Sequence, residues 1–261
     1  MNSTYNIYDF TKNGSGIKTK YFAQNAYAQY LRWSSDKQIL LVTAGAFSDS
    51  WENYGKPVGL CVENGYIINK VIQYNWDGMV LIYNTNQLLS DIVVVDIGVK
   101  NVIVNALDGS NQKYVYSLKS SAADRMNFLN WGEHANITLF QTQLLYSTDK
   151  YSNNNLNNPY YGDSRERRFL AVCTKNGITH DIIIDIPNEI KLNLATSYAK
   201  YVLEYAGYSV SYIMNLDTGD KNILYRYNGS YLQNMHPYKG NYPERATIEN
   251  ATNLLVFYKD I

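Results

Sequence analysis

The stretch "RRFLAVCTKNGITHDIIIDI", residues 167–186, is central to the fold. Two apolar runs rich in β-branched residues flank Asn176-Gly177, a dipeptide that favours the tight turn of a β-hairpin. The sequence therefore predicts two long antiparallel strands here. Within the second run, Asp181 and Asp185 bracket three isoleucines, and we interpret them as residues that end the strand. The same turn signal recurs at Asn64-Gly65 in "VGLCVENGYIIN" and predicts a second hairpin.

Two segments are predicted to be helices. The run "SSAADRMNFLNWGEHA", residues 120–135, predicts one helix. In the second, 191–206, apolar residues recur at steps of three and four and Gly207 follows as a stop signal, which predicts a helix packed under the strand that ends at Asp217. The fold class is therefore α+β: twisted, mainly antiparallel or mixed sheets with two main helices packed against them.

The patterning also suggests how the chain is divided. Residues 1–37 are polar and weakly patterned, and we interpret them as an N-terminal arm or a peripheral layer. Residues 38–261 form one domain, within which the asparagine-rich segment 151–163 is interpreted as a loop insertion.

Composition excludes several classes of partner. The chain has 261 residues and no net charge, and no basic run indicates nucleic-acid binding. The apolar runs are too short to span a membrane, and no signal peptide is visible, so we expect synthesis in the cytoplasm. Cys61 and Cys173 lie in apolar runs and are interpreted as buried hydrophobes, with a disulfide or metal pair as the alternative. No cofactor and no metal site are expected.

Five motifs, taken in their order along the chain, are similar to a known family. They are "TAGAF" at 43–47, "KPVGLCVENG" at 56–65, "RRFLAVCTKNG" at 167–177, "NLDTGDK" at 215–221 and "ERATIENATNLLVF" at 244–257. The set resembles the phosphodiester glycosidases, relatives of the lysosomal enzyme that uncovers mannose 6-phosphate by removing N-acetylglucosamine. The resemblance covers the chain from Gln38 to its end and implies the fold of that family.

The resemblance also implies a site. Cleavage of a sugar 1-phosphodiester requires a carboxylate at the oxocarbenium-like transition state and a cation that holds the departing phosphate. The matching residues are Asp217 as the carboxylate, Arg168 as the phosphate clamp and Glu244 in the late turn; the ligand-binding candidates are Thr43, Gly45, Asn215, Gly219, Lys221 and Arg245. The alternatives to these site roles are structural: Asp217 caps a turn, and Arg168, Glu244 and Arg245 are charged residues on the surface.

The sequence departs from the family pattern in the two loops that the resemblance assigns to the catalytic site. Thr43 stands where the family has asparagine, and Thr218, Asp220 and Lys221 replace glycine or serine in the turn after Asp217. Successive glycines let backbone amides approach an anion, whereas Asp220 places negative charge there. We therefore expect eroded catalytic loops.

Three functions remain open. The chain could be an active glycosidase on a phosphodiester-linked or other anionic glycan, a glycan-binding relative without activity, or a structural subunit of a larger assembly such as a phage tail or a secretion apparatus. Tyrosine, present 26 times, suits both sugar stacking and protein interfaces. We favour a non-catalytic subunit whose partners are carbohydrate or other protein subunits, and the absent signal peptide fits incorporation into a particle assembled in the cytoplasm.

Overall fold

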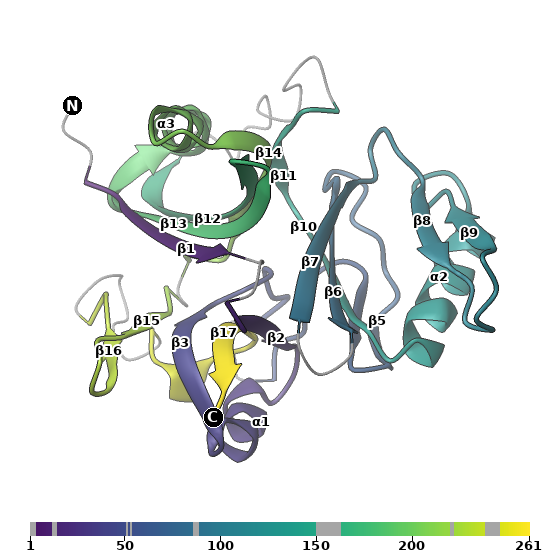
Figure 1. The fold of residues 1–261 in the computed structure, drawn as a ribbon, viewed down its shortest axis with the longest axis horizontal. Coiled ribbons are helices and arrows are strands. Elements are labelled where there is room, and N and C mark those ends of the chain that lie inside the picture. The colour runs from purple at the N-terminus through teal and green to yellow at the C-terminus, as the bar shows by residue number, and fades with distance from the viewer. Residues whose placement is uncertain are drawn as a thin grey trace.

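The structure is a computed structural model that describes residues 4–11, 15–50, 52, 54–85, 89–149, 163–219, 222–237 and 246–261. It is an α+β fold of three five-stranded sheets that face one another, with one helix on the outer side of each (Figure 1). Every strand pairing among the described residues is antiparallel. The predicted fold class is confirmed.

The first sheet, here called the hairpin sheet, contains the stretch 167–186. Its strands in order are β1 (Asn6–Thr11), β13 (Ile178–Lys191), β12 (Ser164–Lys175), β14 (Ser209–Leu216) and β11 (Leu144–Ser147). The turn at Asn176 and Gly177 has positive φ at both residues, 53° and 76°, as a two-residue hairpin requires. The predicted hairpin is confirmed.

The prediction that Asp181 and Asp185 end the strand is wrong. Strand β13 continues to Lys191, and both carboxylates lie inside it and are buried. The physical reason is tertiary: Asp185 lies opposite Arg168 in the strand register, and the opposite charge lets a carboxylate remain in a buried strand.

The other two sheets are named for their place in the chain. The C-terminal sheet consists of β16 (Leu232–Asn234), β15 (Leu224–Tyr227), β3 (Lys37–Thr43), β17 (Leu254–Asp260) and β2 (Lys18–Phe22). The middle sheet consists of β5 (Tyr66–Asn69), β4 (Cys61–Glu63), β10 (Thr138–Thr142), β6 (Gly78–Thr85) and β7 (Leu89–Asp96), and a separate pair is β8 (Val102–Asn105) with β9 (Lys113–Tyr116). The hairpin predicted at Asn64-Gly65 joins β4 to β5 and is confirmed.

Each helix buries one face against its own sheet. Helix α2 (Ala122–His134) packs against the middle sheet, and α3 (Leu192–Tyr205) packs against the hairpin sheet, including β14, so both predicted helices are confirmed. A third, α1 (Ala26–Ser34), packs on the C-terminal sheet. No helix in the described ranges combines the length and the apolar character that a membrane crossing needs.

Residues 4–37 supply strands at the edges of two sheets. Strand β1 pairs with β13, and β2 pairs with β17. The domain boundary at residue 37 stays a prediction, and the loop predicted over 151–163 lies, except for Asp163, outside the described residues.

The inner faces of the three sheets meet in one apolar core. Its aromatic members stack across sheet boundaries: Phe10 lies 3.9 Å from Phe257 and Tyr21 lies 4.5 Å from Phe140, between ring centroids. These pairs connect β1 to β17 and β2 to β10, so the core fixes the sheets relative to one another. Cys61 and Cys173 are buried and free, as the interpretation as buried hydrophobes expects.

Candidate functional site

Thr43, Arg168 and Asp217, three of the predicted site residues, lie where the hairpin sheet meets the C-terminal sheet. Arg168 on β12 is opposite Leu216 on β14, so it neighbours the strand end that carries Asp217. Thr43 ends β3 and reaches the same region, because its hydroxyl accepts a hydrogen bond from Arg168 Nη1 at 3.3 Å. The fold therefore brings together three segments that are more than 40 residues apart in the chain.

Arg168 is fully buried, with 0% of its surface exposed. Its Nη1 donates to the carbonyl of Ile223 at 2.8 Å, and its Nη2 donates to Asn222 Oδ1 at 2.7 Å and to Asp185 Oδ1 at 3.0 Å. The guanidinium therefore joins β12, β13 and the segment before β15. In this arrangement its charge is neutralised inside the protein.

Asp185 is the centre of this buried network. Its second oxygen, Oδ2, lies 2.9 Å from Nε2 of His236, which is also buried. Burial alone would raise the pKa of Asp185, but the Arg168 guanidinium and the His236 hydrogen bond outweigh it and hold the pKa below its usual value. We call Arg168, Asp185, His236, Asn222 and Thr43 the Arg168 cluster.

The lowered pKa of Asp185 predicts a pH dependence of stability. A depressed folded-state pKa contributes stability that is present above the unfolded value of about 4 and is lost as pH falls through the folded value. We expect the difference in the free energy of unfolding between the wild type and Asp185→Asn to be largest near neutrality and to shrink as the solution is acidified from about pH 5. Urea unfolding at a series of pH values measures it, and a difference that does not change with pH would contradict the prediction.

The turn after β14 is built on Asp217, which is only partly buried. Its Oδ1 accepts a hydrogen bond from the amide of Gly219 at 2.9 Å, and its own amide donates to the carbonyl of Gly45 at 2.9 Å. This is the local bonding of a turn-forming aspartate. The residue therefore lies at the end of a strand and is neither fully buried nor fully exposed.

The position of Gly45 requires glycine. A Cβ there would lie 2.6 Å from a ring carbon of Tyr21 and 2.9 Å from Oδ1 of Asn253, which accepts the Gly45 amide hydrogen bond. Asn253 also donates to the carbonyl of Ala46 at 2.8 Å. The loop that the sequence matched to the family is therefore held against Asp217 by buried hydrogen bonds.

The remaining predicted residues fall into two groups. Asn215 is buried and donates through Nδ2 to Gln143 Oε1 at 2.8 Å, which ties it to the strand connection before β11 rather than to Arg168. Lys221, Glu244 and Arg245 lie outside the described residues.

Sequence reasoning missed Asp185, Asn222, His236 and Asn253. One signal was available, because a carboxylate inside an isoleucine run demands a buried cation. In the part of the chain that the structure describes, no three His, Cys, Asp or Glu side chains are grouped so that they could hold a metal ion.

The arrangement of the sheets and helices has a counterpart among solved structures. The chain is similar to the zebrafish N-acetylglucosamine-1-phosphodiester alpha-N-acetylglucosaminidase catalytic domain, auto-inhibited by its pro-peptide, with a TM-score of 0.50 and 12% identity over 99% of this chain and 83% of that one. At that identity the likeness concerns the fold alone.

A second structure, a hypothetical protein from Synechocystis, matches with a TM-score of 0.46 and 13% identity over 98% of this chain and 60% of that one. No family model matches the sequence, and no curated protein sequence matches it.

Proposed function

We propose that this chain is a degenerate member of the phosphodiester glycosidase family that serves as a structural or glycan-binding subunit of a larger assembly, such as a phage tail or a secretion apparatus. The observation that carries the proposal is the burial of Arg168. A phosphate clamp must present its guanidinium to the ligand, whereas this one makes its hydrogen bonds to Thr43, Ile223, Asn222 and Asp185 inside the protein.

Two further observations support loss of catalysis. Thr43, at the family's asparagine position, is fully buried and donates its hydroxyl to the carbonyl of Ala44. Thr218, in place of glycine, is buried and donates to the carbonyl of Glu166 at 2.8 Å. Both threonine hydroxyls therefore donate hydrogen bonds within the protein.

The alternative function is hydrolysis of a sugar 1-phosphodiester or a related anionic glycan. It is favoured by Asp217, a partly buried residue that follows β14 and whose amide donates to the carbonyl of Gly45. In this alternative Asp217 acts as acid, base or nucleophile, and a group other than Arg168 must neutralise the phosphate.

Turnover separates the two functions. We expect purified protein incubated with UDP-N-acetylglucosamine to release N-acetylglucosamine no faster than Asp217→Ala, because Arg168, the residue that matches the phosphate clamp, is buried and hydrogen-bonded inside the protein. Asp163→Ala, at a surface carboxylate 69% exposed, is the matched control. Release that is lost in Asp217→Ala and kept in Asp163→Ala would show catalysis and exclude the proposal.

Binding is measured on the same proteins. A glycan-binding role predicts that an array of phosphodiester-linked and neutral glycans retains the wild type and Asp217→Ala equally. If no glycan retains either protein, the structural role remains, and co-purification of defined assembly components then tests it.

A further inference from the structure

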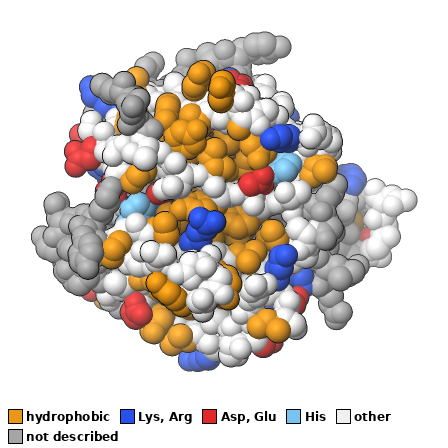
Figure 2. Space-filling view, turned by 60° about the vertical axis from the view of Figure 1, so that its left-hand side comes forward, with side chains coloured by type: hydrophobic (Ala, Val, Ile, Leu, Met, Phe, Trp, Pro, Cys, Tyr) orange, Lys and Arg blue, Asp and Glu red, His pale blue; other side chains and the backbone are white. Residues whose placement is uncertain are grey.

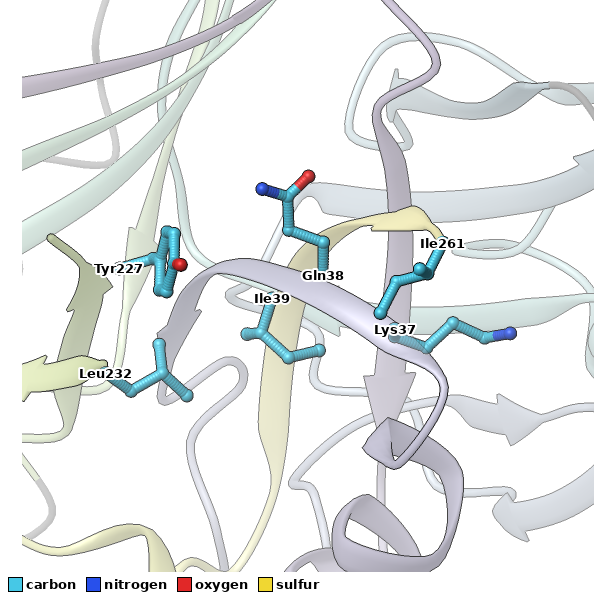
Figure 3. Close-up of a pocket in the computed structure, with 6 residues that line it drawn as sticks. All are labelled: Lys37, Gln38, Ile39, Tyr227, Leu232 and Ile261. Atoms are coloured by element: carbon cyan, nitrogen blue, oxygen red, sulfur yellow. The ribbon is translucent and has the colours of Figure 1, made fainter. Parts of the chain in front are cut away.

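A groove follows the open edge of β3. Its first section, about 570 Å³, is lined by Lys37, Gln38 and Ile39 of β3 together with Tyr227, Leu232 and Ile261 (Figure 3). Its second section, about 280 Å³, is lined by Leu40 and Leu41 of β3, by Ile7–Phe10 of β1, and by Ile17, Arg226 and Tyr227. Tyr227 lines both sections, so we treat them as one feature, the β3-edge groove.

The lining residues show that the groove runs along main chain. Side chains of a strand point alternately to opposite faces, so a pocket on one face touches every second residue. Here Lys37 to Leu41 line the two sections in unbroken order, and so do the four residues of β1. The groove therefore lies along strand edges, where backbone amides and carbonyls are presented.

Among the residues that the structure describes, strand pairing leaves these edges open. Strand β15 pairs with β3 only at Leu41–Thr43 and then continues into its hairpin with β16, while β17 covers the opposite side of β3 down to Lys37. Strand β1 pairs with β13 alone among the described strands. An open, partly apolar edge of this kind is a template for an added strand.

One charge in the groove is available to a ligand. Lys37 is paired with Asp36 and Asp260, and Asp9 accepts hydrogen bonds from Tyr208 and from the ring of His180. Arg226 is exposed, lies 5.4 Å from the ring centroid of Tyr8, and has no carboxylate partner in the described part of the chain. On the side of the molecule where β1 and β15 lie, Figure 2 shows a basic side chain surrounded by hydrophobic ones.

We propose that the β3-edge groove binds an extended peptide segment of a partner protein, with an acidic side chain opposite Arg226. The segment pairs with Lys37–Leu40, the part of this edge that β15 does not cover and a length of roughly 13 Å at the rise of a β-strand, and places apolar side chains against Ile39, Tyr227 and Leu232. Residues of β1 line the groove on one side and residues of the β15–β16 hairpin line it on the other, so the space suits a single extended segment rather than the edge of a second sheet. Only a free segment with both edges unpaired enters such a space.

The probe is a set of capped synthetic peptides of about seven residues, the length of an ordinary β-strand, with alternating valine and threonine and a central Glu, Gln or Lys. We expect the Glu peptide to bind about fivefold more tightly than the Lys peptide in fluorescence anisotropy, because it pairs with Arg226. Arg226→Gln should remove that preference, and Arg165→Gln, a surface arginine outside the groove, should keep it. Hydrogen exchange should show new protection of the Gln38 and Leu40 amides or of their neighbours in β3.

A second peptide tests the main-chain pairing. N-methylation of alternate amides of the Glu peptide removes hydrogen bonds without changing its side chains, and we expect binding to fall about tenfold. Equal binding of the methylated and unmethylated Glu peptides would overturn the proposal. Failure of the Glu, Gln and Lys peptides to bind at about 1 mM would also overturn it. So would a result in which the groove binds a glycan through Tyr227 and none of the peptides. Peptide binding to the groove does not involve Asp217, so the result of this experiment is independent of whether the proposed function is correct.

Discussion

Replacement of Arg168 by methionine is expected to lower the free energy of unfolding by about 3–5 kcal/mol, because it leaves the Asp185 carboxylate buried without its cation. Arg168 is 0% and Asp185 1% exposed, so solvent does not compensate for the loss. Asn222 and the carbonyl of Ile223 lose their donor as well. Urea unfolding followed by circular dichroism measures the effect.

The matched control is Arg165→Met. Arg165 lies three residues earlier on the same strand, is 47% exposed and pairs with Asp163 at 3.4 Å, so its loss should cost under about 1 kcal/mol. The double variant Arg168→Met with Asp185→Leu should recover part of the stability, since an apolar pair often replaces a buried ion pair well. If Arg168→Met lowers the free energy of unfolding by less than about 1 kcal/mol, the guanidinium does not stabilise the fold, and the phosphate-clamp role would regain support.

Phe257→Ala is expected to cost about 3–5 kcal/mol, the usual range for deletion of a buried aromatic side chain. Phe257 on β17 is fully buried and stacks on Phe10 of β1, with an interplanar angle of 8°. The substitution removes the aromatic contact between the C-terminal sheet and the hairpin sheet and leaves a cavity in the shared core.

The control for this prediction is Tyr231→Ala, because that side chain is 60% exposed and should change stability by less than about 0.5 kcal/mol. A double-mutant cycle with Phe10→Ala should give a coupling of about 0.5–1.5 kcal/mol between the two rings. Additive losses in the cycle would show that the rings do not interact across the sheets.

The elements that sequence reasoning predicted share one property, which is that their signals are local. Both Asn-Gly turns form because these residues accept positive φ, and α3 forms because its apolar residues fall on one face. Helix α1 was missed because it is only nine residues long and buries only Ala26 and Tyr30. The end of β13 was predicted wrongly because aspartate usually ends a strand, whereas Asp185 stays inside this one by pairing with Arg168 on the neighbouring strand.

For the candidate site, too, the sequence predicted local features but not the partners that come from distant segments. The sequence matched Thr43, Gly45, Arg168 and Asp217 to one region, and the fold does bring their segments together. It did not reveal Asp185 and His236, which come from β13 and from the segment after β16.

The two hairpin turns, the two longer helices and the α+β class were predictable from the sequence, because their signals lie in neighbouring residues. Whether Arg168 faces a ligand or the interior, and which strand edges stay open, became clear only from the folded chain. Those properties depend on the packing of three sheets against one another. The burial of a charge is set by residues that are close in space, and no pattern along the chain records it.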